Sequence, residues 1–180
     1  MANGLVYINT AVDPETGEIK QKNVQRKVYF DEQNGYLFFS QKNGARTFDG
    51  IDLPDTLTDF DIAKLYRLSR RIYRNSNLLT YRTGNNIKPM QIMQIARLLR
   101  MSERCAVIFV NKMIRMRILA KAVIDIGSEK QVQYYMNPIY FFNGKWLSLN
   151  LYLLFKVDLD GVLPEWVRRK FNDVELGKNN

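Results

Sequence analysis

The sequence predicts an α+β fold in which a winged helix-turn-helix core follows a small antiparallel β-meander. The first fifty residues alternate β-favouring segments with tight turns, and residues 88–121 contain two apolar runs of helical spacing separated by a break. Two alternating segments follow directly. We expect the meander at residues 1–54, the core at 55–136, an aromatic and helical C-terminal extension at 137–174, and a flexible tail at 175–180.

Length and composition favour one main globular core. The chain has 180 residues, and a hydrophobic fraction of 46% with 12% aromatics argues against general disorder. No apolar run approaches the roughly 18 residues of a membrane-spanning helix, and the start MANGLVYINT lacks the features of a signal peptide. We therefore expect a soluble cytoplasmic protein without membrane contact, with its single cysteine, Cys105, as a small packing residue.

Missing residue types exclude most enzyme classes. Without histidine and with one cysteine, the chain cannot build a usual His/Cys zinc site, a Ser-His or Cys-His nucleophile pair, or an imidazole acid or base. A GxxxxGK[ST] phosphate loop is also absent. The acids of IDLPDTLTDFD admit a metal site, but capping of a helix N-terminus is the favoured interpretation. We expect no enzyme activity, no cofactor and no metal.

The net charge of +9 is concentrated in the middle of the chain. Residues 1–61 carry 6 basic and 10 acidic groups, residues 64–121 carry 14 and 1, and residues 122–180 carry 7 and 7. A directed basic face of this kind favours a polyanionic partner.

Before the helix pair, residues typical of turns and helix caps predict a β-meander and one basic helix. Asn34-Gly35 and Asn43-Gly44 are typical of hairpin turns, and Thr58 or Asp59 caps the helix FDIAKLYRLSRRIYRN. The apolar stripe expected to face inward is Phe60, Ala63, Leu65, Leu68 and Ile72. The basic residues expected to face outward are Lys64, Arg67, Arg70, Arg71 and Arg74. A loop at Thr83 to Asn86 then precedes Pro89, which suits the first turn of a helix.

The helix pair has a predicted inner and outer face. The inner residues of the first helix are Met90, Ile92, Ile95, Ala96 and Leu99, and those of the second are Ala106, Phe109, Val110 and Met113. Ser102 is the expected N-cap of the second helix, whose outer residues are then Glu103, Arg104, Val107, Ile108, Asn111 and Lys112.

These outer residues are candidates for DNA recognition. Arginine can pair with guanine and asparagine with adenine, so Arg104 is the best candidate for base reading. The candidate DNA contacts are Arg97, Arg100, Ser102, Arg104, Ile108, Asn111, Lys112, Arg115 and Lys130. Among them Arg97, Arg100 and Arg115 are expected on phosphates, Asn111 and Lys112 on bases or phosphates, and Lys130 at the tip of a wing. For Val107 and Ile108, packing beneath the wing is an alternative to groove contact.

The segments after the helix pair complete the predicted fold. Residues 118–125 and 131–136 form the hairpin that serves as the wing. SLNLYLLF is a short helix capped by Ser148 or Asn150, and PEWVRRKF is a final amphipathic helix. Trp166 and Phe171 form either a dimer seam or a contact with the core.

The motif Ile95-Ala96-Arg97-Leu98-Leu99 and the spaced apolar residues from Ala106 to Met113 resemble winged-helix regulators of the MarR type, over residues 60–136. The segments Tyr134 to Trp146 and Leu149 to Phe155 resemble the region after the wing in RepL-type plasmid and phage replication proteins of Gram-positive bacteria. Arg117 departs from the pattern, because winged-helix regulators often have a glycine before the wing.

The leading hypothesis is sequence-specific binding of double-stranded DNA, and the RepL resemblance implies initiation or maintenance of plasmid or phage replication. A phage or plasmid transcription regulator is the alternative within the same class. A tyrosine-based DNA-nicking initiator and a protein that binds another protein through the helix pair are hypotheses from other classes. Candidate partners besides DNA are a second copy of the chain and host replication or transcription proteins.

Overall fold

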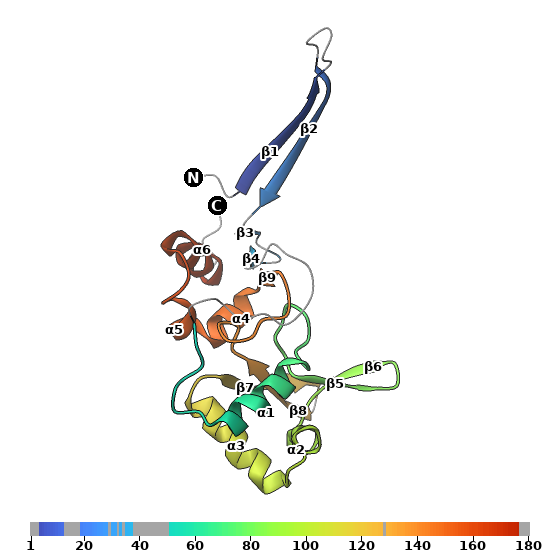
Figure 1. Ribbon diagram of the computed structural model, residues 1–180, viewed down its shortest axis with the longest axis vertical. Coiled ribbons are helices and arrows are strands. Elements are labelled where there is room, and N and C mark those ends of the chain that lie inside the picture. Colours follow the sequence, from blue (N-terminus) through green and yellow to red (C-terminus); the bar gives the residue numbers. More distant parts are fainter. Residues whose placement is uncertain are drawn as a thin grey trace.

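In the computed structural model the chain has an α+β fold, with helices and small antiparallel sheets alternating along the sequence (Figure 1). The structure describes residues 4–12, 19–28, 30–31, 33, 35–37, 51–127 and 129–176. Its helices are α1 (Asp59–Ser69), α2 (Ile92–Leu99), α3 (Glu103–Arg115), α4 (Leu149–Leu154), α5 (Lys156–Leu159) and α6 (Glu165–Glu175). No helix of this described part is long and apolar enough to cross a membrane.

The strands pair into four antiparallel sheets within the described residues. The pairs β1–β2, β5–β6 and β7–β8 are hairpins, whereas β3, β4 and β9 form one sheet in that order. The strands are β1 (Gly4–Val12), β2 (Ile19–Val28), β3 (Phe30–Asp31), β4 (Gly35–Leu37), β5 (Thr80–Thr83), β6 (Asn86–Pro89), β7 (Leu119–Ile126), β8 (Glu129–Met136) and β9 (Trp146–Leu147).

A first hydrophobic core lies between α1, α2, α3 and the β7–β8 hairpin. The inner residues predicted for α3 are all buried, and so are Ile95, Ala96 and Leu99 of α2. An isolated bridge between Leu78 and Tyr135 adds a short extended segment to the outer side of β8. The chain order in this core is therefore helix, short strand, two helices and hairpin.

A second hydrophobic core holds the C-terminal helices together with residues from the start of the chain. Tyr152 of α4 stacks on Phe171 of α6 with ring centroids 4.3 Å apart, and Phe30 of β3 meets Phe171 edge-on at 5.0 Å. Phe171 is fully buried, so docking on the core is the interpretation that holds for it. Trp166 is 36% exposed and meets Tyr36 edge-on at 5.9 Å.

The second core contains residues from both sides of the domain boundary that the sequence predicts after residue 54. β4 pairs with β9, with Tyr36 opposite Leu147. Gly35 has a φ of +86°, and a Cβ there would lie 2.0 Å from the carbonyl oxygen of Leu147, so only glycine fits. Gly35, which the sequence predicts in a hairpin turn, therefore also permits the close approach of β9. Asn43-Gly44 lies outside the described residues.

Two fully buried asparagines hold the chain around the end of β8, and Asn137 also connects the first core to the second. The side-chain amide of Asn77 donates to the carbonyl oxygens of Met136 (2.9 Å) and Phe141 (2.7 Å). That of Asn137 donates to the carbonyl oxygen of Arg117 (2.8 Å) and to Asp158 Oδ2 (3.1 Å). Because buried amides need such partners, these bonds fix the path of the chain where it leaves β8.

Local cap and strand signals in the sequence are confirmed. Each predicted N-cap hydroxyl accepts a hydrogen bond from the backbone N–H three residues further on. The caps are Thr58 (3.2 Å), Ser102 (3.2 Å) and Ser148 (3.4 Å). The predicted wing segments form β7 and β8 around a turn at Gly127, with Asp125 opposite Lys130.

Several local predictions are wrong. Phe60, expected inside, is 79% exposed, and Ala63 is exposed as well. The buried residues of α1 are Asp61, Leu65, Leu68 and Ser69, and Ile72 is buried just after the helix, so the buried side begins with a carboxylate that an apolar pattern does not include. Cys105, expected to pack, is also exposed.

Two element boundaries also differ from the sequence predictions. The loop predicted at Thr83 to Asn86 is the turn of the β5–β6 hairpin, and Pro89 ends β6 instead of starting a helix. Glu175, placed in the tail, is the last residue of α6, and residues 177–180 lie outside the described residues.

Arg117 explains how the chain turns from α3 into β7 without a glycine. Its φ is +56°, in the left-handed region, while its N–H donates to the Ile114 carbonyl oxygen (2.9 Å) and the N–H of Ile118 donates to that of Met113 (2.9 Å). This is the Schellman pattern, which glycine usually completes. The Arg117 guanidinium reaches Asp158 Oδ1 at 2.9 Å, an ion pair that glycine cannot make.

We expect Arg117→Gly to be more stable than Arg117→Ala by about 1 kcal/mol. Both substitutions remove the ion pair with Asp158, but only alanine retains the cost of a left-handed conformation. Denaturant unfolding of the two variants measures the difference directly. Equal free energies of unfolding would contradict the strain assigned to this position.

Candidate nucleic-acid interface

The outward face of α3 is open along the whole helix. Arg104, Asn111 and Arg115 are exposed, as are the apolar side chains of Val107 and Ile108, of which Ile108 is 60% exposed. The last two therefore do not pack beneath the hairpin, which was the alternative for them. The 3.6-residue period predicted this face correctly, because its complement, from Ala106 to Met113, is the buried side.

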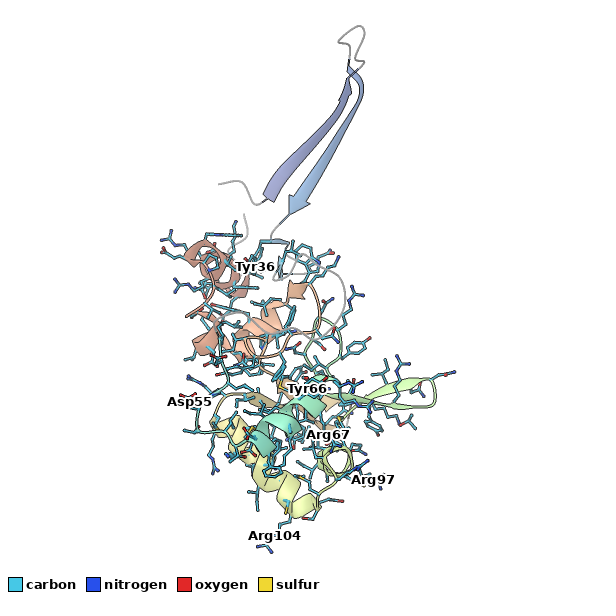
Figure 2. All side chains as sticks on the ribbon, in the orientation of Figure 1. Tyr36, Asp55, Tyr66, Arg67, Arg97 and Arg104 are labelled. Atoms are coloured by element: carbon cyan, nitrogen blue, oxygen red, sulfur yellow. The ribbon has the colours of Figure 1, made fainter. Side chains whose placement is uncertain are left out.

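Positive charge surrounds this face. Figure 2 shows Arg97 of α2 and Arg104 at the start of α3 pointing outward at the end of the molecule away from α6. Arg100 and Lys130 are exposed too, and Glu103 is the only acid on α3. Of the candidate residues, Arg97, Arg100, Arg104 and Arg115 thus present guanidinium groups to solvent from the two helices.

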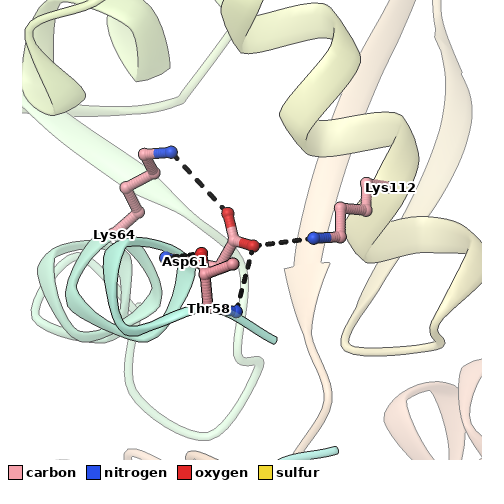
Figure 3. A network of polar contacts seen from close by, with 4 residues as sticks. All are labelled: Thr58, Asp61, Lys64 and Lys112. Atoms are coloured by element: carbon pink, nitrogen blue, oxygen red, sulfur yellow. Dashed lines mark hydrogen bonds and ion pairs between the residues drawn. The ribbon is translucent and has the colours of Figure 1, made fainter. Parts of the chain in front are cut away.

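Lys112 is a correction to the predicted outer face. Its ammonium group donates to Asp61 Oδ2 at 2.7 Å, which ties α3 to α1 (Figure 3). Lys64 lies 3.6 Å from the other oxygen of the same carboxylate and 5.1 Å from the centroid of the Phe109 ring. Lys112 is therefore a contact between helices, and we remove it from the candidate DNA contacts.

Asp61 also closes the capping box of α1. Its backbone N–H donates to the Thr58 hydroxyl, and its carboxylate accepts from the Thr58 backbone N–H at 3.4 Å. Burial by itself would raise the pKa of Asp61, but the hydrogen bonds from Lys112 and Thr58 outweigh it and hold the pKa below its ordinary value. The acid-rich segment before α1 thus supplies a cap and a buried ion pair.

Ser102 and Arg100 shape the turn between α2 and α3. The Ser102 hydroxyl is occupied by the backbone N–H of Cys105, so its role here is to start α3. Arg100 has a φ of +56° and ends α2, with the N–H of Met101 donating to the Ala96 carbonyl oxygen at 3.0 Å. The turn directs α3 so that its outer face and the side chain of Arg97 are both exposed.

The structure adds arginines that the sequence assigned only to an outward helix face. Arg100 lies with Arg67, Arg70 and Arg71 of the α1 end around a hollow of about 390 Å³. The signal that could have found this cluster is the run of residues 62–102, which contains nine lysines and arginines and no acid.

Comparisons with protein-family models, with curated proteins and with solved structures found no match for this chain.

We expect Asp61→Asn to destabilise the protein by about 1–2 kcal/mol at neutral pH, because it removes the charge from a capping box and an ion pair. The folded-state pKa of Asp61 lies below its unfolded value, so its contribution is present above the unfolded pKa and lost as pH falls through the folded pKa. The gap in melting temperature between wild type and Asp61→Asn should therefore shrink from neutral to strongly acidic pH.

Asp55→Asn is the matched control, since it removes an equal charge from an exposed acid just before α1. A constant gap in melting temperature across pH for Asp61→Asn, or an equal effect of Asp55→Asn, would show that the ion pair does not stabilise the fold.

Proposed function

We propose that this protein binds double-stranded DNA in a sequence-specific manner through a winged helix-turn-helix, with α3 as the recognition helix. The observation that carries the proposal is the open face of α3, which presents two arginines, an asparagine and two apolar side chains next to the exposed Arg97 and Arg100, with Glu103 as the one acid of α3. Side chains of these types read base edges in the major groove.

The order of elements supports the winged-helix assignment. The helix α1, the extended segment at Leu78, the β5–β6 hairpin, the pair α2–α3 and the hairpin β7–β8 follow one another, and Leu78 pairs with Tyr135 of β8. In helix-turn-helix proteins the second helix of the pair enters the major groove and its N-terminal residues contact bases. This order gives β7–β8 the role of the wing.

The proposed roles follow from position. Arg104, in the first turn of α3, reads a base, and Asn111, two turns later, contacts a base or a phosphate. Arg97, Arg100 and Arg115 contact phosphates, which fix the register on the duplex without reading sequence. Lys130, beside the hairpin turn, contacts the backbone or the minor groove.

The biological role that we favour is recognition of a plasmid or phage replication origin, followed by recruitment of host replication proteins. Regulation of a promoter is the second candidate. Footprinting on the parent replicon separates the two. Protection at the origin together with a copy-number defect on deletion supports replication, whereas protection confined to promoters would refute it. Two protected half-sites related by symmetry would also indicate a homodimer.

The tyrosine-based nicking hypothesis gains little support from the tyrosines of the C-terminal half. Burial raises the pKa of Tyr134, Tyr135 and Tyr140, and burial together with a hydrogen bond to Asp160 raises that of Tyr152 further. A raised pKa disfavours the phenolate that would attack a phosphate. A covalent adduct formed on supercoiled origin DNA in the presence of magnesium would revive this hypothesis.

We expect Arg104→Ala to weaken binding to the preferred duplex by roughly 1–3 kcal/mol while leaving binding to random duplex nearly unchanged. Arg97→Ala should weaken both duplexes by similar factors, because its proposed contact is a phosphate. The two arginines are both exposed and lie on neighbouring helices, so they form a matched pair. Fluorescence anisotropy titrations with the two duplexes measure the affinities.

Equal loss on both duplexes for Arg104→Ala would remove α3 as the reading element. Salt supplies an independent check, since each phosphate contact releases counterions and affinity should fall steeply between low and moderate salt. Affinity independent of salt would argue that the helix pair binds a protein instead of DNA.

A further inference from the structure

A second surface lies on the side of α1 and the β5–β6 hairpin. Arg100, a proposed contact of duplex phosphates, also lines its first hollow, so the two surfaces adjoin at this residue. The hollow at the end of α1 adjoins another of about 310 Å³, since Arg70 and Arg71 line both. Figure 2 shows Arg67 on α1 well away from Arg104 at the start of α3. We call it the arginine–tyrosine surface and define it by Arg67, Arg70, Arg71, Tyr73, Tyr81 and Arg82.

The arginines of this surface have no carboxylate partner among the described residues. The ion pairs of the described residues use the carboxylates of Asp61, Asp158, Glu165 and Glu175. None of these carboxylates pairs with an arginine of the arginine–tyrosine surface. Six arginines line the two adjoining hollows, and their guanidinium groups repel one another until an anion enters. Guanidinium forks match the oxygen pairs of phosphate groups, and two neighbouring hollows lined by arginines suit successive phosphates of one strand.

Two tyrosines, Tyr73 and Tyr81, lie beside these arginines. Tyr73 is 47% exposed and lines the second hollow together with Tyr81, which is half-buried, and with Arg82. An aromatic face beside a cationic groove is the arrangement on which unpaired bases stack while their phosphates bind the cations. A duplex cannot use it in this way, since its base faces are covered by neighbouring base pairs.

We infer that the arginine–tyrosine surface binds single-stranded nucleic acid, with the arginines on the phosphates and Tyr73 and Tyr81 stacked on bases. This inference goes beyond duplex recognition by α3, because it concerns another face and another form of the polymer. One molecule then holds a duplex through α3 and an unpaired strand through the end of α1 and the β5–β6 hairpin.

The test is fluorescence anisotropy with a labelled oligo(dT) of roughly 15 nucleotides, within the length range of single-strand sites. Tyr73→Leu should weaken oligo(dT) binding roughly 5-fold or more, whereas Tyr73→Phe retains the ring and should keep the affinity. Both variants should bind duplex DNA like wild type. Their melting temperatures check that the fold is intact.

Charge is tested at an exposed position with a matched control. Arg71→Gln should weaken oligo(dT) binding and lower the slope of log affinity against log salt by roughly 0.7, the value for one phosphate of a single strand. Arg169→Gln removes the same charge from the exposed face of α6 and should change neither quantity. Polyglutamate should compete poorly, because it lacks bases to stack.

Four outcomes would overturn the inference. They are equal affinities of Tyr73→Leu and Tyr73→Phe, equal loss of oligo(dT) and duplex binding in Arg71→Gln, full competition by polyglutamate, and no oligo(dT) binding by wild type. The duplex proposal is judged separately by Arg104→Ala. Loss of preferred-duplex binding in that variant with unchanged oligo(dT) binding would support two independent surfaces.

Discussion

The fully buried side chain of Asn137 is the contact on which the arrangement of the two cores depends. Its amide nitrogen donates to the carbonyl oxygen of Arg117, just after α3, and to a carboxylate oxygen of Asp158. Asp158 also forms an ion pair with the Arg117 guanidinium. One cluster thus joins α3, the start of β7 and α5. Because a buried amide without partners is costly, the cluster permits few alternative positions of the second core relative to α3. The open face of α3 is therefore presented from a rigid base.

A second polar contact joins α3 to α1. Asp61 caps α1 and accepts from Lys112, so α1 and α3 are joined by a buried carboxylate in addition to apolar packing. The acid on α1 neutralises a lysine that would otherwise add to the basic surface. The remaining positive charge then belongs mostly to arginines, which bind phosphate with a defined geometry. Charge is thus divided between a contact that holds the helices and groups that are open to a ligand.

The sequence predicted the parts of the fold that local signals determine. The periodicity of α2 and α3, the hydroxyl caps and the alternation in β7 and β8 each depend on residues close in the chain, so these elements and, apart from Lys112, the exposed face of α3 were predicted correctly. The capping role of the acids at the start of α1 was predicted, but the burial of Asp61 was not, because its partner Lys112 is remote in sequence. The β5–β6 hairpin was missed since its strands are short and polar. The sequence could not predict that Arg100 lies beside the arginines at the end of α1, because only the folded chain brings them together.

The pairing of β4 with β9 has a consequence for the order in which the protein folds. Among the described residues, the buried side chains of the first core all lie within residues 57–141. The second core brings Phe30 and Tyr36 together with residues as late as Phe171, so its formation requires nearly the complete chain. During synthesis we expect the first core to form on the nascent chain before β4 pairs with β9, because contacts between residues distant in the sequence form last.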